Sequence, residues 1–262
     1  MSDAPLNSKI DENGVGWVTL NRPELHNAFD DVLIKGLLDA FTAMANDESV
    51  WAVVLTSEGK SFSAGADFNW MKRVGSYGPE ENKADAMVLA KLLKTMNFME
   101  KPLIGLVQGA AFGGGVGLAA CCDIVIASEK ASFCLSEVKI GLAPSTISPY
   151  VVSAIGAQAA RRYFVTAERI DAQEAKALGL VHKLVPHDQL REAGDEMIAL
   201  LAKNGPKAMA KSKELVFAVD QPLTEEIMEY TAEHIASIRA TPEGKEGLGA
   251  FLEKRKPSWI KD

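Results

Sequence analysis

Short apolar runs alternate with segments of helical periodicity in the first half of the chain. Four continuous apolar runs, each bounded by polar residues or glycine, cover residues 16–20, 51–56, 103–107 and 124–127. Between them, segments near 30–45 and 79–99 carry apolar residues at helical spacing, so one side of each should pack on a sheet. Short buried strands separated by helices are typical of a parallel sheet with crossover helices. The pattern therefore predicts an α/β fold.

The pattern becomes almost entirely helical after Pro149. The segments with helical spacing are 157–164, 172–178, 188–203, 206–219, 223–238 and 242–254. A sheet-forming part followed by a purely helical part indicates a change of architecture near 185–205. We therefore expect a core over residues 1–195 and a helical C-terminal module over residues 196–262.

The composition narrows the functional classes. The chain has 262 residues, 47% of them hydrophobic and 24% charged, which is ordinary for a globular protein. Its net charge of −7 argues against a nucleic-acid partner, because phosphate backbones require a basic face. The N-terminus has no basic stretch followed by an apolar run, and no apolar window is long enough for a membrane span. We expect a cytoplasmic protein with no membrane partner.

Cysteine and histidine usage indicates neither disulfides nor a metal site. The three cysteines are odd in number and lie in apolar surroundings, which favours a reducing compartment. The sequence has no C-x-x-C pair, and its four histidines lack ligand spacing. We therefore expect no bound metal.

Two glycine-bearing segments, residues 63–67 and 113–117, each follow a predicted strand and precede a helical pattern. Backbone N–H groups at two such turns can converge on one oxygen that becomes negative during a reaction, and glycine or alanine leaves room for the ligand. In this interpretation the N–H of Ala66, at the start of a helix, donates a hydrogen bond to an anionic oxygen. The simpler alternative is a tight turn with Asp67 as the helix cap.

A dinucleotide-binding turn is the rival interpretation of the second glycine segment. Residues 115–120 satisfy a G-x-G-x-x-A pattern, and Glu137 stands about where an acidic residue would hold a cofactor ribose. The pattern lies in the middle of the chain, however, and the first strand has no such fingerprint. A dehydrogenase therefore remains a minor alternative.

Glu137 is the candidate proton-transfer group. It lies in a mostly apolar stretch, residues 133–144, where a carboxylate is costly unless it is paired or functional. Burial would raise its pKa and favour proton exchange. The structural alternative is an ion pair with Lys139 or with an arginine such as Arg161.

Taken together, these segments resemble the crotonase, or enoyl-CoA hydratase/isomerase, superfamily over nearly the whole chain. The resemblance is carried by residues 21–29, 62–67, 109–115, 122–124 and 246–256. It implies a spiral of ββα units with a helical trimerisation module, assembled as a homotrimer or a dimer of trimers. It also implies an acyl-CoA thioester substrate and no separate cofactor, because coenzyme A is part of the substrate.

The resemblance assigns roles to individual residues. The N–H groups of Ala66 and Gly114 would bind the thioester oxygen, and Glu137 would transfer the proton. The positions that match those along the adenine and pantetheine arm of coenzyme A are Leu25, Ala64, Asp67 and Phe68. Lys254 matches a position that meets the phosphate end, often across a subunit boundary. These assignments are implied by position alone.

Gly117 departs from the two-glutamate hydratases, which have a second carboxylate at this position. Residues 64–71, 108–119 and 133–149 look most like bacterial methylglutaconyl-CoA hydratases, which tolerate a small residue there. We therefore expect an enoyl-CoA hydratase with Glu137 as the base. A glutaconyl substrate would also need a cation for its distal carboxylate, and Lys72, Arg73 and Lys139 are the cations that the sequence offers.

Other activities remain open from the sequence. An isomerase or a decarboxylase could use the same carboxylate and the same pair of N–H groups. A non-catalytic acyl-CoA-binding protein is the alternative of a different class, and the glycine at position 117 keeps it open.

Overall fold

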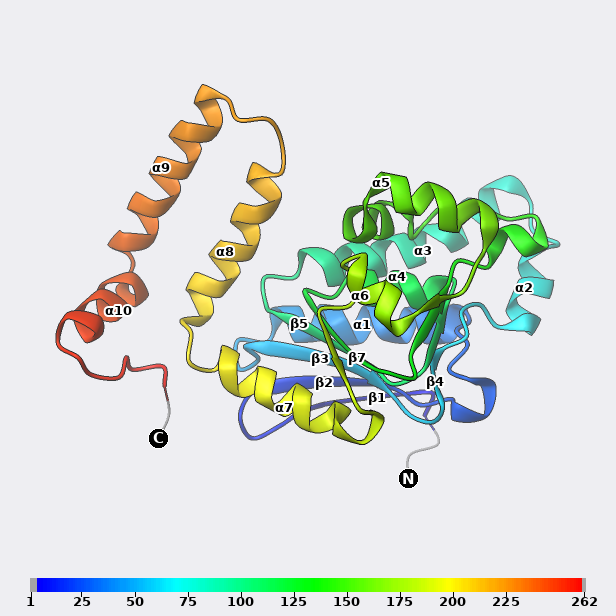
Figure 1. Ribbon diagram of the computed structural model, residues 1–262, viewed down its shortest axis with the longest axis horizontal. Coiled ribbons are helices and arrows are strands. Elements are labelled where there is room, and N and C mark those ends of the chain that lie inside the picture. Colours follow the sequence, from blue (N-terminus) through cyan, green and yellow to red (C-terminus); the bar gives the residue numbers. More distant parts are fainter. Residues whose placement is uncertain (1–3, 261–262) are drawn as a thin grey trace. The chain divides into compact units, whose positions relative to one another are not determined.

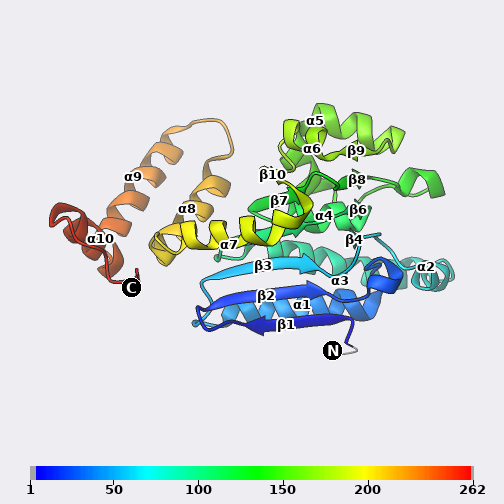
Figure 2. The same ribbon diagram turned by 60° about the horizontal axis from the view of Figure 1, so that its bottom comes forward.

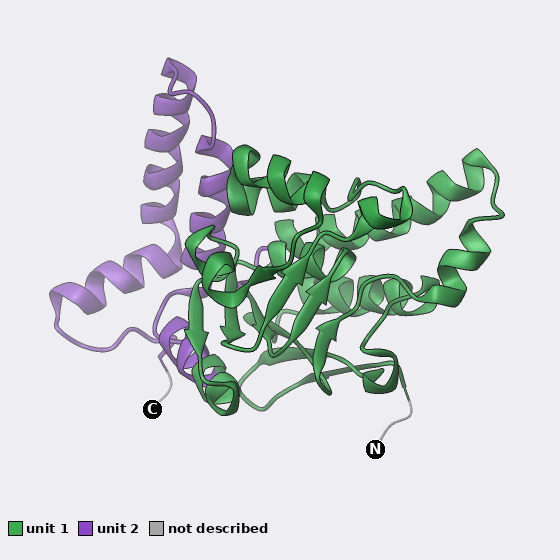
Figure 3. Ribbon diagram, turned by 45° about the vertical axis from the view of Figure 1, so that its right-hand side comes forward, with its two compact units in different colours: residues 1–99, 103–194 green, residues 100–102, 195–262 purple. Residues whose placement is uncertain are grey.

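The computed structural model describes residues 4–260, which form two compact units (Figure 3). The first comprises the chain up to residue 99 together with residues 103–194. The second comprises residues 100–102 and the chain from residue 195 onward. The predicted site residues Leu25, Ala64, Ala66, Gly114 and Glu137 all belong to the first unit.

A six-stranded sheet forms the centre of the first unit. Its strands are β1 (Leu6–Ile10), β2 (Val15–Leu20), β3 (Ala52–Ser57), β5 (Leu103–Val107), β7 (Ile124–Ser128) and β10 (Lys183–Val185), in the order β1-β2-β3-β5-β7-β10. β1 pairs antiparallel with β2, and every other pair is parallel. Figure 2 shows β1, β2 and β3 side by side. The four apolar runs correspond to β2, β3, β5 and β7, since both faces of these strands are buried.

A second, smaller sheet positions the candidate site. It contains β4 (Ser61–Ser63), β6 (Ala110–Phe112), β8 (Ser132–Cys134) and β9 (Ile170–Asp171), in the order β4-β6-β8-β9. β4, β6 and β8 run parallel, with Ser63 opposite Ala111 and Phe112 opposite Cys134. Their carboxyl ends therefore lie at one edge of the sheet. The segments that leave this edge are the two glycine turns and the stretch that leads to Glu137.

Helices follow the strand pairs and confirm the predicted α/β class. In the first unit they are α1 (Asp31–Asn46), α2 (Phe68–Val74), α3 (Pro79–Phe98), α4 (Gly114–Ala120), α5 (Ser148–Thr166) and α6 (Ala172–Ala177), with 3-10 turns η1 (Pro23–Leu25), η2 (Glu137–Ile140) and η3 (His187–Gln189). The chain thus repeats a main-sheet strand, a small-sheet strand and a helix, as in β3-β4-α2 and β5-β6-α4 (Figure 1).

Packing explains where the long helices form. α1 buries Leu33, Leu37 and Phe41 at helical spacing, and the Asp30 carboxylate caps it by accepting the Leu33 N–H at 2.9 Å. α5 begins at Ser148 rather than near 157, and Gly156, with a φ of 75°, interrupts it. The interruption explains why only its second half has clear helical spacing in the sequence.

The second unit is helical. The boundary between the units falls within α7 (Leu190–Leu201), so the second unit begins with the end of this helix. It continues with α8 (Pro206–Val219), α9 (Glu225–Ala240) and α10 (Pro242–Leu252). α8 and α9 form an antiparallel pair (Figure 1). The Glu243 carboxylate accepts the N–H groups of Lys207 and Ala208, at 3.1 and 2.6 Å, and so caps α8 from α10.

Over residues 4–260, none of the helices combines the length and the apolar character that a membrane span requires.

Candidate active site

A single parallel bridge orients the first glycine turn. The Phe29 N–H donates to the Gly65 carbonyl at 2.8 Å, and the Asp67 N–H donates to the Phe29 carbonyl at 3.0 Å. The residue between these two bonds, Ala66, therefore directs its own N–H away from Phe29. That N–H has no acceptor within residues 4–260. Gly65 has a φ of 86°, a conformation that side chains strongly disfavour.

The second glycine turn supplies another free donor. Gly113, with a φ of 50°, precedes α4 and donates its N–H to the Cys134 carbonyl at 2.8 Å. Gly114 is the first residue of α4, so its N–H has no intrahelical acceptor. No other acceptor for it is found in the described part of the chain.

The two turns are in direct contact. A Cβ atom on Gly65 would lie 2.8 Å from the Phe112 carbonyl oxygen and 3.7 Å from the Gly113 Cα. A Cβ atom on Gly115 would lie 2.8 Å from the Ser63 carbonyl oxygen. Backbone packs on backbone at these positions, which leaves no space for a side chain. The two free N–H groups therefore belong to adjoining turns.

Phe29 supports both turns, although the sequence did not single it out. Its backbone forms the bridge to Ala66, and its buried ring lies beneath Gly114, where a Cβ atom would be only 2.1 Å from the ring Cζ. The position of one donor is thus coupled to that of the other through a single core side chain.

Glu137 lies against the second turn. Its Oε1 atom is 3.2 Å from the place where a Gly113 Cβ would stand, and its buried Oε2 has no hydrogen-bond partner in the described structure. Burial raises the pKa of this carboxyl group above its ordinary value. The alternative ion pair with Lys139 or Arg161 is absent from residues 4–260. The structure thus brings Ala66, Gly114 and Glu137 together.

An aliphatic side chain fills the space beside Gly117. A Cβ atom there would lie 2.2 Å from Ile147 Cγ2, 2.8 Å from Ile147 Cβ and 3.7 Å from Leu93 Cδ2. A second carboxylate at position 117 therefore has no room. The same packing argues against the dinucleotide alternative, because Gly115 and Gly117 lie buried inside α4 rather than in an open phosphate-binding loop.

The positions matched to coenzyme A differ in exposure. Leu25 and Phe68 are 43% and 74% exposed, and exposed Ala64 donates its N–H to the His26 carbonyl at 2.9 Å. Asp67 is buried instead: its carboxylate caps α2 by accepting the Asn69 N–H at 2.8 Å. Asp67 is therefore the cap of α2, while the N–H of its neighbour Ala66 stays without an acceptor in the described residues.

Lys254 follows α10 in the second unit, where it is exposed and has a φ of 55°. It belongs to the second unit, whereas Ala66, Gly114 and Glu137 belong to the first.

Two cations, Lys139 and Arg169, lie near the edge of the small sheet. The Arg169 guanidinium stacks on the Phe112 ring, 5.1 Å from its centroid. Burial raises the pKa of the Cys134 thiol, and the positive charges of Lys139 and Arg169 oppose that rise. Neither cation has a hydrogen bond or ion pair within residues 4–260. Arg169 was not recognised from the sequence, because its neighbour Phe112 is distant along the chain.

Metal-binding geometry is absent from the described residues. No three histidine, cysteine, aspartate or glutamate side chains within residues 4–260 are grouped so that they could hold a metal ion.

The chain is similar to several known proteins over almost its whole length. The profile of the family described as "Enoyl-CoA hydratase/isomerase" matches residues 11–262. A crystal structure of an enoyl-CoA hydratase from Shewanella pealeana is 46% identical, with a TM-score of 0.94, over 98% of this chain and 96% of that one. A mitochondrial enoyl-CoA hydratase of Pongo abelii is 36% identical over 94% of this chain and 84% of its own length. A short-chain-enoyl-CoA hydratase of Clostridium acetobutylicum is 33% identical over 96% of each.

Proposed function

Because the chain belongs to the enoyl-CoA hydratase/isomerase family, we propose that it adds water across the α,β double bond of an enoyl-CoA thioester at the cluster of Ala66, Gly114 and Glu137. The chain is an enzyme of the hydratase type that acts on acyl-CoA. One observation carries the assignment of the site. Among residues 4–260, two backbone N–H groups without acceptors belong to adjoining turns, and a buried carboxylate whose Oε2 has no hydrogen-bond partner there lies against the second turn.

The two N–H groups stabilise the negative charge that develops during the reaction. When the oxygen of water bonds to the β-carbon, the electrons of the double bond move toward the thioester oxygen. Ala66 and Gly114 donate to that oxygen and favour the enolate-like state over the ground state. Loss of one such donor typically costs about 3 to 4 kcal/mol in the transition state.

Glu137 transfers the proton. As a carboxylate it accepts a proton from the attacking water, and the resulting acid returns a proton to the α-carbon, so that one water is added in total. A raised pKa suits both steps, because it makes the carboxylate a better base at neutral pH. With Ile147 in the space beside Gly117, this single carboxylate serves as both base and acid.

The finer substrate proposal is a methylglutaconyl-type acyl group, whose distal carboxylate requires a cation. Arg73 forms an ion pair with Asp31 at 2.5 Å, so its charge is already neutralised. Lys139 and Arg169 have no such partner in the described residues and lie near Cys134, three residues before Glu137. Because they lie near Cys134 and Glu137, these two cations suit a second carboxylate on the acyl chain.

The family resemblance supports the remaining assignments. Exposed Leu25, Ala64 and Phe68 would contact the coenzyme A arm, and Asp67 would hold the start of α2 beside it. Lys254 would meet the phosphate end of coenzyme A within a homotrimer or dimer of trimers.

Hydration in ¹⁸O-labelled water tests the proposal. The wild-type enzyme is expected to incorporate one solvent oxygen at the β-carbon of crotonyl-CoA and of 3-methylglutaconyl-CoA. Glu137→Gln should lower that rate by about a thousandfold, whereas Glu129→Gln, at an exposed glutamate, should not change it. A Glu137→Gln rate within about tenfold of the wild-type rate would contradict the assignment.

The same assay separates the alternatives. Double-bond movement in a 3-enoyl-CoA without solvent oxygen would identify an isomerase. Release of carbon dioxide from a malonyl-type thioester would identify a decarboxylase. Binding of acyl-CoA with no turnover of any of these thioesters would identify a non-catalytic protein.

A further inference from the structure

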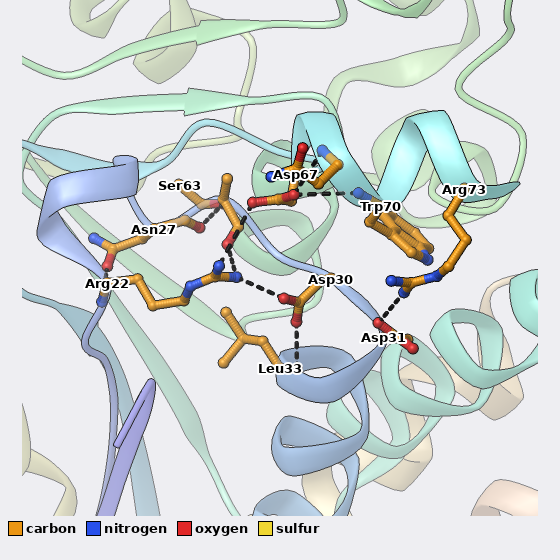
Figure 4. Close-up of polar contacts among 11 residues, drawn as sticks. Arg22, Asn27, Asp30, Asp31, Leu33, Ser63, Asp67, Trp70 and Arg73 are labelled. Atoms are coloured by element: carbon orange, nitrogen blue, oxygen red, sulfur yellow. Dashed lines mark hydrogen bonds and ion pairs between the residues drawn. The ribbon is translucent and has the colours of Figure 1, made fainter. Parts of the chain in front are cut away.

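Arg22 joins three oxygen acceptors beside the first glycine turn (Figure 4). Its Nη1 donates to the Ala28 carbonyl at 2.9 Å and to Asp30 Oδ2 at 3.0 Å, and its Nη2 donates to Asp67 Oδ2 at 3.5 Å. The Arg22 side chain is only 15% exposed, and both carboxylates are also largely buried. One guanidinium therefore connects the segment before α1 with the residue that begins α2.

These acceptors surround the bridge that orients Ala66. Ala28 and Asp30 are the two neighbours of Phe29, and Asp67 directly follows Ala66. Arg22 thus holds both sides of the Phe29–Ala66 bridge. A guanidinium suits this task because its donors form a rigid planar fork, whereas a lysine presents one compact charge.

Buried side chains fix the other end of the same turn. Asn27 Oδ1 accepts the backbone N–H of Arg22 at 2.8 Å, and Asn27 Nδ2 donates to the Ser61 carbonyl at 2.9 Å. The Ser63 hydroxyl donates to the Asn27 carbonyl at 2.8 Å and accepts the Gly65 N–H at 3.2 Å. The first glycine turn is therefore anchored at its start through Ser63 and at its end through Asp67. Arg22 takes part in both anchors, through its backbone N–H to Asn27 and through its guanidinium to Asp67.

We propose that Arg22 is a positioning residue for the oxyanion site: it sets the direction of the Ala66 N–H relative to that of Gly114. The proposal rests on the proposed function, because it assumes that both N–H groups bind a thioester oxygen. Arg22 itself does not touch the substrate. It acts through Ala28, Asp30 and Asp67.

Replacement of Arg22 should shift the bridge without unfolding the unit. Asp30 and Asp67 also cap α1 and α2, through the N–H groups of Leu33 and Asn69, and these bonds do not depend on Arg22. Without the guanidinium, however, the two carboxylates have no cation between them and repel each other. The segments on either side of the bridge are then expected to move apart.

The experiment measures the polarisation of the carbonyl directly. The infrared frequency of a ¹³C-labelled thioester carbonyl, in a bound but unreactive saturated butyryl-CoA, is compared among the wild type, Arg22→Gln and Arg22→Lys. Steady-state kinetics with crotonyl-CoA accompany it. Arg162→Gln is the matched control, because Arg162 lies on α5 and its guanidinium forms an exposed ion pair with Glu168.

Arg22→Gln should lower kcat by about 10- to 100-fold, change KM by less than about threefold, and return the carbonyl frequency toward that of free thioester. Arg22→Lys should be intermediate in both readouts, and Arg162→Gln should match the wild type. An unchanged frequency in Arg22→Gln overturns the proposal, even if kcat falls. Should Arg22→Gln not fold, an unchanged frequency in Arg22→Lys overturns it in the same way.

The wild type distinguishes this proposal from the proposed function. If the wild-type frequency does not shift when the thioester binds, the oxyanion site itself is wrong. If the wild-type frequency shifts and Arg22→Gln shifts equally, only the role of Arg22 is wrong.

Discussion

Gly114→Ala tests the coupling between the two proposed donors. The added methyl group would lie 2.1 Å from Cζ, 2.9 Å from Cε2 and 3.2 Å from Cε1 of Phe29. That ring is 2% exposed and packs in the core, so it cannot turn into solvent. Either Gly114 or Phe29 must move, and Phe29 carries the bridge to Ala66.

The size of the effect follows from these contacts. Overpacking of this kind costs about 1 to 3 kcal/mol of unfolding free energy. Displacement of one oxyanion donor typically lowers kcat by about 100- to 1000-fold. Since the clash reaches both donors, we expect a loss of kcat of at least about 100-fold, together with the modest loss of stability.

Chemical denaturation and steady-state hydration of crotonyl-CoA measure the two effects on the same sample. Gly105→Ala is the control. Gly105 lies within β5, and its added methyl group would lie 2.9 Å from Cys122 Sγ, so the substitution should reduce stability without reducing kcat. Phe29→Leu in the Gly114→Ala background removes the ring atoms that clash, so it should restore part of the lost kcat. The reasoning is refuted if Gly114→Ala loses stability as Gly105→Ala does but keeps kcat within about threefold of the wild type.

Two further predictions concern the carboxylate and its surroundings. Burial raises the pKa of Glu137 above its ordinary value of 4.5, so ionisation of this carboxyl group destabilises the folded state as the pH rises. Glu137→Gln should therefore raise Tm at pH 8, and this gain should vanish near pH 4. An equal gain at both pH values would contradict the prediction. Gly117→Glu should lower Tm by several degrees, since Ile147 occupies the space, and Ile147→Ala should recover part of that loss in a thermal scan; an unchanged Tm for Gly117→Glu would contradict the packing.

The sequence predicted four of the six strands of the main sheet, without β1 and β10, and none of the small sheet. β2, β3, β5 and β7 have both faces buried, so each appears as a continuous apolar run. β4, β6, β8 and β9 are two or three residues long, too short for any periodicity to be visible. β1 was missed because three of its five residues are exposed.

The candidate site could be predicted only where residue type alone was informative. Glycine turns after strands indicated residues 63–67 and 113–117, and the family resemblance assigned Ala66 and Gly114 within them. A carboxylate in an apolar stretch indicated Glu137. Contacts between residues distant along the chain were out of reach. The sequence does not show that Phe29 packs beneath Gly114, or that Ile147 fills the space beside Gly117.

Arg22 illustrates the same limit. It belongs to the segment 21–29 that carried the family resemblance, but a motif does not say which atoms its members contact. Its role depends on carboxylates 8 and 45 residues away in sequence, which only the fold brings within hydrogen-bonding distance.

A crystal structure of the enzyme with 3-hydroxybutyryl-CoA, the product of water addition to crotonyl-CoA, tests the central claim most directly. We predict the thioester oxygen at about 2.7 to 3.1 Å from the backbone nitrogens of both Ala66 and Gly114. The Glu137 carboxylate should lie within about 3.2 Å of the 3-hydroxyl group. A thioester oxygen bound away from either nitrogen, or a Glu137 side chain directed away from the acyl chain, would contradict the account.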